Sequence, residues 1–406
     1  MDDDLVVEPT GSDLHGEAER LRARGPAVRV RLPENIGAWA VSDFDWLREL
    51  LTDPRVSKDP EQHWSAWRRG EHRQSWARWW VGQSSMLTAY GADHRRLRRL
   101  VAPAFSARRI EALAPAIRCR TGELLEEMVA TAPGASVDLR TAFAHPLPMA
   151  VICELFGIPA GDQRAVGEVF DLMMNSFDDL ERAQTAQADA LEIFRRLVAH
   201  KREQPGEDLT SALVSARDED DGSRLTEQEL LDTLFTMVGA GHETTVNLIG
   251  NAVHALLTHP EQLALVQAGS ATWSDVVEET LRWAPSIANL PLRFAVEDIA
   301  LPDGSGTIRE GEAILPAYAA AGRSPDKHGP DAHVFDLTRA EPEHLAFGHG
   351  VHFCLGAPLA RMEGRIALSA LFERFPRLRL ATAPEHIPQV PSWIAHGHRR
   401  LPVLLT

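Results

Sequence analysis

The chain has 406 residues, 44% of them hydrophobic, which is enough to bury a large core. Its formal net charge of −16 argues against nucleic acid as a partner, because phosphate binding needs a basic surface. The N-terminus is acidic and no apolar run reaches about 18 residues, so we expect no signal peptide and no membrane association. Three scattered cysteines, Cys119, Cys153 and Cys354, predict a reducing compartment, namely the cytoplasm.

The first half of the chain shows two strand patterns followed by long helical ones. Residues 27–32 and 37–42 alternate in polarity as strands around a turn at Pro33, and Asp43 can cap a helix that runs to about residue 51. Residues 56–90 look irregular and contain five of the ten tryptophans. From about residue 93 to 200 the apolar spacing is mostly helical, with interruptions at proline and glycine.

The longest helix is predicted near the middle of the chain. Thr226 and Glu229 form a capping box, and helical spacing continues to Thr258. At 1.5 Å per residue this helix spans about 50 Å, so it should cross the whole molecule. A helix over 273–283, strands near 292–296, 299–301 and 314–318, and a last helix over about 355–375 follow. The elements predict a mostly α fold with a small β part, in a single domain over residues 1–406.

One cysteine lies between a glycine-rich loop and the last predicted helix. Gly348 and Gly350 permit backbone angles that other residues resist, and Gly356 follows Cys354 by two positions. Pro358 is tolerable in the first turn of a helix. Cys354 would therefore lie at a helix N-terminus, where free N–H groups and the helix dipole favour thiolate over thiol.

Three roles are open for Cys354 on this pattern alone. It could be a buried structural cysteine. It could join His344, His349 and His352 in a zinc site, although their spacing matches no familiar zinc pattern. It could also be the single axial thiolate of a haem iron.

A second unusual segment lies inside the long predicted helix, at Met237-Val-Gly-Ala-Gly-His-Glu-Thr-Thr245. Two glycines in a helix interior cost roughly 1 kcal/mol each relative to alanine, and threonines are also poor helix formers. The glycines could pack against a neighbouring helix. Alternatively they leave room for a flat cofactor, with an acid and an alcohol beside it.

The cysteine loop has the pattern Phe347-x-x-Gly350-x-x-x-Cys354-x-Gly356, which closely resembles the haem-binding signature of the cytochrome P450 family. The resemblance covers nearly the full length and looks actinobacterial. It implies the single-domain P450 fold, with the long helix crossing the haem. It also implies heme b (iron protoporphyrin IX) as the cofactor, with Cys354 as its axial ligand and Phe347, Gly348 and Gly356 in contact with it.

The segment Ala240-Gly-His-Glu-Thr-Thr245 resembles the oxygen-activation motif of the same family. By that resemblance Ala240 and Gly241 would lie against the haem. Thr244 would hydrogen-bond bound dioxygen, and Glu243 would relay protons to it. Cleavage of the O–O bond requires such proton delivery, with bulk water excluded.

The resemblance also implies ligands for the two haem propionates. Arginine and histidine supply charge-assisted hydrogen bonds to carboxylates. The family places such ligands at the positions of His94, Arg98, Arg293 and His352. The alternatives are surface charges for His94 and Arg98 and a salt bridge for Arg293.

Glu279 and Arg282 are three residues apart on one predicted helix, so they can pair. With Arg339, they resemble the buried Glu-Arg-Arg ion network of the family. We assign these three residues to supporting the haem loop, not to chemistry.

The implied activity is that of a haem-thiolate monooxygenase, because a thiolate ligand favours O–O cleavage. One oxygen atom of O2 would enter a C–H bond by hydroxylation or epoxidation. The alternatives are a non-catalytic haem-thiolate sensor, a peroxide-driven peroxygenase and a zinc hydrolase.

The expected substrate is a hydrophobic polycyclic or macrocyclic small molecule, such as a steroid or a macrolide-type natural product. By resemblance, its pocket would be formed by residues 64–90, 170–177, 287–290 and 393–394, which are mostly bulky and apolar. For each tryptophan in these segments, ordinary packing is the alternative.

Electrons would come from NAD(P)H through an external carrier, because the chain has no flavin or nicotinamide motif. We expect Arg95, Arg96 and Arg99 to help dock an acidic ferredoxin or similar carrier. A monomer is expected.

Overall fold

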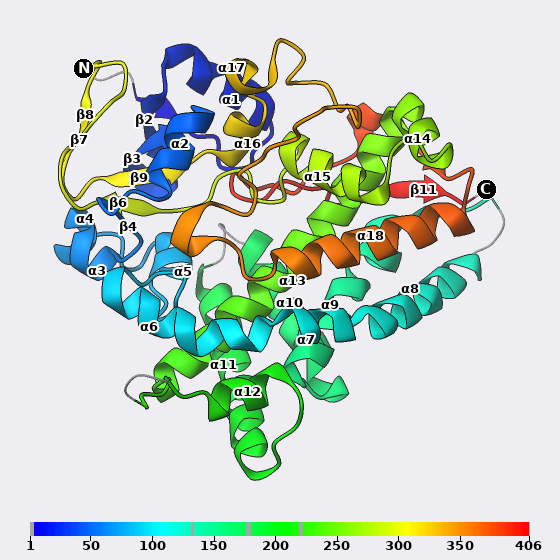
Figure 1. Cartoon of the computed structure of the whole chain (residues 1–406), viewed down its shortest axis with the longest axis horizontal. Helices are drawn as coiled ribbons and strands as arrows, with labels where there is room; N and C mark the ends of the chain where they lie inside the picture. The colour runs from blue at the N-terminus through cyan, green and yellow to red at the C-terminus, as the bar shows by residue number, and fades with distance from the viewer. Residues whose placement is uncertain (1–3, 131–133, 176–179, 219–221, 406) are drawn as a thin grey trace.

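Many helices and a few short strands make up the chain, as the sequence predicted. The computed structural model describes residues 4–130, 134–175, 180–218 and 222–405, without the side chains of residues 171–181, 183 and 184. Figure 1 shows the largest sheet among the short helices of the N-terminal part, and the long helices filling the rest of the molecule. The described helices are α1 (Leu14–Arg24), α2 (Phe44–Leu50), α3 (Pro60–His63), α4 (Ser65–Arg68), α5 (Ala77–Val81), α6 (Gly91–Val101), α7 (Ala107–Ala112), α8 (Ala114–Val129), α9 (Pro146–Phe156), α10 (Ala160–Asn175), α11 (Leu180–Glu203), α12 (Leu209–Ser215), α13 (Glu227–Thr258), α14 (Pro260–Gln267), α15 (Trp273–Trp283), α16 (Tyr318–Gly322), α17 (Pro325–His328) and α18 (Ala357–Arg374).

The main sheet joins segments that are far apart in the sequence. Its strand order is β1-β2-β3-β9-β6-β4. Strands β2 and β3 form an antiparallel hairpin, β3 runs parallel to β9, and β6 is antiparallel to both β9 and β4. The strands are β1 (Leu5–Val6), β2 (Ala27–Leu32), β3 (Ile36–Val41), β4 (Val56–Ser57), β6 (Arg293–Ala295) and β9 (Ala313–Pro316).

Two smaller sheets complete the β part. One has the order β10-β11-β5, with β5 (Ser136–Asp138), β10 (Arg379–Leu380) and β11 (Pro402–Leu404). The other is a hairpin of β7 (Ile299–Ala300) and β8 (Thr307–Ile308). The predicted strands in the first half and near residues 293 and 313 are confirmed. The prediction that residues 314–318 form one strand is wrong at its end, because Tyr318 begins α16.

Helix α13 is the longest described element and passes through the middle of the molecule, behind α18 in Figure 1. Its predicted capping box is present: Thr226 accepts a hydrogen bond from the Glu229 amide, and Glu229 accepts one from the Thr226 amide. It contacts α9, α11, α15 and α18, so neighbours surround most of its length. This position explains why its central residues are buried and how it can form one wall of a site.

Two large groups of buried side chains hold the fold together. One lies among helices α8 to α18, and the other lies between the main sheet and helices α1, α4 and α5. Asp43 caps α2 as predicted, by accepting from the Trp46 amide at 2.8 Å. Across the described ranges, no helix is long and apolar enough to cross a membrane.

Candidate functional site

The loop before α18 holds Cys354 in a fixed orientation. Gly348 (φ +70°) and Gly350 (φ +72°) adopt the left-handed conformation that the sequence predicted for them. The Cys354 amide donates to the Phe347 carbonyl at 3.0 Å, which closes the loop. The Cys354 sulfur accepts hydrogen bonds from the amides of Gly356 and Ala357, where α18 begins. The free amides expected at the helix N-terminus are therefore directed at the sulfur.

The expectation that this environment favours thiolate over thiol is wrong for the protein alone. Cys354 keeps solvent-accessible surface, yet protein surrounds its sulfur on most sides. Burial raises the pKa of Cys354, whereas the two amide hydrogen bonds and the charges of Arg98 and Arg361 lower it. The effect of burial is the larger one, so the pKa lies above its usual value of 9.0. The amides do favour the anion, but desolvation outweighs them. A bound metal cation would favour the thiolate, because its charge stabilises the coordinating sulfur anion.

An ion-pair network that the sequence reasoning missed supports the cysteine loop. Glu278 accepts hydrogen bonds from Arg361 Nε at 2.6 Å and Arg361 Nη2 at 2.7 Å, and it lies 3.1 Å from His344 Nε2. Burial would raise the pKa of Glu278, but the hydrogen bonds from Arg361 and His344 lower it to about 2. The Arg361 guanidinium lies 4.7 Å from the ring centroid of Phe347. The network thus ties α15 and α18 to both ends of the loop.

The zinc alternative for Cys354 is not supported. His344 faces Glu278, and the ring of His352 lies 4.1 Å from that of His94. Within the described ranges, no group of three or more histidine, cysteine or acidic side chains is placed to hold a metal ion. A planar cofactor with Cys354 as its single cysteine ligand therefore fits this loop better than a zinc ion does.

The four predicted propionate ligands meet beside the loop, together with one residue that was not predicted. We call Lys58, His94, Arg98, Arg293 and His352 the cationic cluster. Burial and the charges of Arg98, Arg95, Arg293 and Lys58 lower the pKa of His94 to about 4. Burial and the charges of Arg293, Lys58, His94 and Arg98 also lower the pKa of His352. Every charged group that shifts the pKa of these two histidines is a cation.

The cluster fits a cofactor that carries carboxylates. His94 Nε2 and Arg293 Nε are buried and have no hydrogen-bond partner among the described residues. Both side chains belong to residues only 3% exposed, which argues against the surface-charge alternative for His94. Arg98 is half-buried and donates to the Phe353 carbonyl at 3.0 Å. Buried donors without acceptors are costly, so an anionic group such as the propionates of haem would satisfy them.

Helix α13 presents an acid and an alcohol at its middle. Glu243 is fully buried, and its Oε1 accepts from Arg140 Nη2 at 2.7 Å. Arg140 also donates to Asn247 Oδ1 at 3.1 Å. Thr244 Oγ1 donates to the Ala240 carbonyl at 2.6 Å, so these two residues lie one turn apart on one face. The Arg140 pairing was not predicted, because the two residues are far apart in the sequence.

The glycines of this helix pack against its neighbours. A Cβ at Gly239 would lie 2.5 Å from the ring of Phe170 on α10, and one at Gly241 would lie 2.4 Å from Ile152 on α9. Both contacts are far shorter than real Cβ contacts, so a larger residue at either position would force its neighbour to move. The packing alternative therefore explains both glycines, whereas the proposed contact of Ala240 and Gly241 with a cofactor stays a prediction.

The predicted network of Glu279, Arg282 and Arg339 is present. Arg282 is fully buried and donates to Glu279 through Nε and Nη2, both at 2.7 Å. Arg339 Nε donates to Glu279 at 3.3 Å. Arg282 also donates to the carbonyls of Gly322, Ala332 and Val334. The network fixes the irregular segment that precedes the cysteine loop to α15, as expected.

Several tryptophans expected near a substrate pack in the sheet core instead. Trp64 stacks on Trp67 with ring centroids 5.7 Å apart, and Trp76 meets Trp393 edge to face at 5.1 Å. All four are 3% exposed or less. Phe170 contacts Phe235 of α13, whereas the side chains of Met173, Met174 and Phe177 lie outside the described ones.

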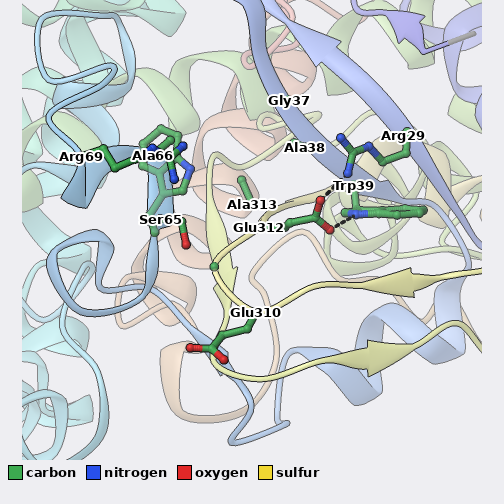
Figure 2. A pocket seen from close by; sticks show the side chains of 12 residues that line it. Arg29, Gly37, Ala38, Trp39, Ser65, Ala66, Arg69, Glu310, Glu312 and Ala313 are labelled. Carbon is green, nitrogen blue, oxygen red and sulfur yellow. Dashed lines mark hydrogen bonds and ion pairs between the residues drawn. The ribbon is translucent and has the colours of Figure 1, made fainter. Parts of the chain in front are cut away.

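A cavity of about 270 Å³ lies between the main sheet and α4, with Trp64 in its lining. Figure 2 shows Glu312 within it, accepting hydrogen bonds from Arg29 and from Trp39 Nε1. Of the predicted residues, only Trp64, Ser65, Ala66 and Arg69 from the 64–90 segment line it, and no predicted cofactor or catalytic residue does. It therefore adds nothing to the site around Cys354.

The basic patch on α6 is largely neutralised within the molecule. Arg96 pairs with Asp93 at 2.7 Å and with Glu229, and Arg99 pairs with Asp218 at 2.8 Å. Arg95 is exposed and has no ion pair with any described residue. The patch that was expected to dock a carrier is thus smaller than the sequence suggested.

The chain is similar to known proteins over its whole length. The model of the cytochrome P450 family matches residues 169–270 and 273–391. The solved structure of CYP154A1 from Streptomyces coelicolor A3(2) is 52% identical, with a TM-score of 0.93 over 99% of this chain and 100% of that chain. CYP154C4 from Streptomyces sp. ATCC 11861, solved with testosterone bound, is 42% identical, with a TM-score of 0.94 over 100% of this chain and 99% of that chain.

A curated relative agrees with the solved structures. The 2-hydroxy-5-methyl-1-naphthoate 7-hydroxylase of Streptomyces carzinostaticus is 41% identical over 403 residues, which cover 98% of this chain and 97% of that protein. The family implies haem held by a cysteine thiolate and the use of O2, and the geometry around Cys354 and the cationic cluster fits that cofactor. The chain therefore belongs to the cytochrome P450 family and is a monooxygenase, an oxidoreductase.

Proposed function

We propose that this monooxygenase inserts one oxygen atom into a C–H bond of a hydrophobic polycyclic or macrocyclic small molecule, with steroids and macrolide-type natural products ahead of fatty acids. The observation that carries the proposal is the Cys354 sulfur, which accepts two amide hydrogen bonds beside a cationic cluster that lacks anions. The substrate class is supported by two relatives, one named for a naphthoate and one solved with testosterone bound.

Haem would supply the activation of O2, and the residues of this chain would hold and protect it. Cys354 would be the axial ligand, with Gly356 and Ala357 amides stabilising its negative charge. His94, Arg98, Arg293 and His352 would bind the propionates. Phe347, Gly348 and Gly356 of the cysteine loop and Ala240 and Gly241 of α13 would contact the cofactor.

On the distal side, the alcohol of Thr244 and the carboxylate of Glu243 would handle protons. The Thr244 hydroxyl currently donates to the Ala240 carbonyl, and a rotation of its side chain would redirect that proton toward a bound ligand. Glu243 is held by Arg140, so proton transfer through its carboxylate would require this ion pair to open. A haem-thiolate sensor would need neither group, whereas a monooxygenase needs both.

We further propose that electrons come from NAD(P)H through an external carrier, such as a ferredoxin. Arg95 supports docking of an acidic carrier, since it is exposed and unpaired within the described residues. A peroxide-driven peroxygenase is the second candidate, and it would not need that carrier. Three free cysteines, with no disulfide between them, support a cytoplasmic location.

The first test is the absorption spectrum of the purified protein, reduced and exposed to carbon monoxide. The far-shifted Soret band typical of the family is expected if Cys354 is a thiolate ligand. An ordinary histidine-type band, or no haem band at all, would refute the assignment. Substrate screening by the spin-state change of the haem should then favour steroids and macrolides, and a response to long-chain fatty acids alone would refute the substrate class.

A further inference from the structure

The chain has only three lysines, and one of them has an environment unlike the other two. Lys201 lies 2.7 Å from Asp208, and Lys327 lies 2.6 Å from Glu343. Lys58 is 1% exposed and has neither a carboxylate partner nor a hydrogen bond among the described residues. A buried ammonium group without a counter-charge is among the most expensive groups in a protein interior, so its presence requires an explanation.

The strand register places a second cation opposite this lysine. In the antiparallel pair of β4 and β6, Val56 faces Ala295 and Ser57 faces Phe294. Lys58 directly follows β4 and Arg293 begins β6, so the same register extended by one residue brings the two opposite each other, and Arg293 is itself 3% exposed. Like charges directly opposite one another are destabilising, and burial makes the repulsion stronger. Burial and the Arg293 charge accordingly hold the pKa of Lys58 well below its usual range.

The same pair of residues faces the two histidines of the cationic cluster. The Lys58 charge acts on both His94 and His352, as does that of Arg293. Arg293 Nε is buried without a hydrogen-bond acceptor, and His94 Nε2 likewise. Tyr318 is the one further described group that interacts with Arg293, and its hydroxyl is neutral at physiological pH. The cluster thus has donors and positive charge, but it has no anion of its own.

We propose that Lys58 is a fifth propionate-binding residue, which shares one haem propionate with Arg293 across the β4–β6 strand pair. A carboxylate between the two side chains would turn their repulsion into two charge-assisted hydrogen bonds. If Lys58 only filled space, its replacement by methionine would stabilise the protein, because methionine has no charge to desolvate. The inference rests on the proposed haem binding at Cys354.

The test compares Lys58→Met, Lys58→Arg and Lys201→Met as ferric haem-bound proteins. Lys201 is the matched control, because its side chain is also largely buried, at 13% exposed, but its partner is Asp208. The measurement is the rate of haem transfer to excess apomyoglobin. Loss of one charge-assisted hydrogen bond should accelerate transfer about tenfold or more in K58M. K58R should stay near the wild-type rate, and K201M should equal the wild type.

Two further readouts separate a propionate contact from a general loss of stability. The reduction potential of K58M should fall, because removal of a positive charge near the iron favours the ferric state. Haem dimethyl ester lacks the propionate charges, so reconstitution with it should accelerate haem loss in the wild type. The ester should accelerate haem loss less in K58M, because the substitution and the ester remove the same interaction. Additive effects would overturn the proposal.

The outcomes also distinguish this inference from the proposed function. If K58M binds haem with the wild-type transfer rate and potential, the propionate role of Lys58 is wrong while the monooxygenase assignment stands. If the wild type shows no thiolate-ligated haem, the proposed function fails first. If K58M does not fold, Lys58→Gln supplies the same test. A wild-type rate of haem transfer in K58Q, or additive effects of K58Q and the dimethyl ester, would refute the proposal.

Discussion

Replacement of Glu278 by glutamine tests the ion pairs that support the cysteine loop. Burial would raise the pKa of Glu278, but Arg361 and His344 lower it from 4.5 to about 2. At about 1.4 kcal/mol per pKa unit, this difference corresponds to about 3 kcal/mol of folding stability near neutral pH. The Glu278 side chain is 28% exposed, so water screens part of the interaction. We therefore expect E278Q to lower the free energy of unfolding by about 2 kcal/mol.

The dependence on pH identifies the cause of that loss. The folded pKa of Glu278 lies below the unfolded value of 4.5, so its contribution is fully present above that pH and disappears as the pH falls through about 2. Urea unfolding of the wild type and E278Q should show the full difference near pH 7 and a smaller one near pH 3. Glu227→Gln is the control, because Glu227 pairs with Arg202 at an exposed site, and it should change stability by less than about 1 kcal/mol. A loss in E278Q that is independent of pH, or no larger than that of the control, would refute the reasoning.

Three other substitutions test the site. Thr244→Ala should lower the fraction of reducing equivalents recovered as product several-fold and raise peroxide release. The control Thr245→Ala removes a hydroxyl bonded to the Gly241 carbonyl and should change neither quantity. An equal recovery of reducing equivalents as product in both variants would exclude the proton role of Thr244. Arg140→Met should lower the free energy of unfolding by about 3 kcal/mol, because it removes the ion pair of Arg140 with the buried Glu243 carboxylate. An unchanged free energy of unfolding in urea would contradict this. Gly350→Ala should weaken haem retention, since it places a side chain at φ +72° with its Cβ 2.8 Å from the methyl group of Thr52, which follows α2. Wild-type rates of haem transfer to apomyoglobin would show that the loop tolerates it.

Local sequence signals predicted the elements that depend on local interactions. The capping box at Thr226 and Glu229 and the helical spacing after it gave α13 its bounds within a residue, because caps and periodicity act within one or two turns. The two-residue strands β1 and β8 were missed, since such short strands exist only through pairing with partners. Their sequences carry no pattern of their own.

The site was predictable where a motif carried it and not where the fold assembled it. Cys354 and its glycine-rich loop follow from one contiguous segment. The ion pair of Glu243 with Arg140 and the proximity of the Lys58 and Arg293 charges depend on packing between distant segments, which one sequence does not reveal. The protonation of Cys354 was misjudged because helix amides are a local effect, whereas desolvation depends on the whole surrounding fold.

The parallel pairing of β3 with β9 has a consequence for synthesis of the protein on the ribosome. Residues 38–41 pair with residues 313–316, so the N-terminal hairpin has no partner on that side until most of the chain has emerged. During this interval the edge of β3 exposes unpaired backbone groups that can template aggregation. Contacts so distant in sequence also slow folding, because loop closure precedes the stabilising contacts. The yield of native protein should therefore depend more strongly on chaperones than that of an all-helical protein of similar length.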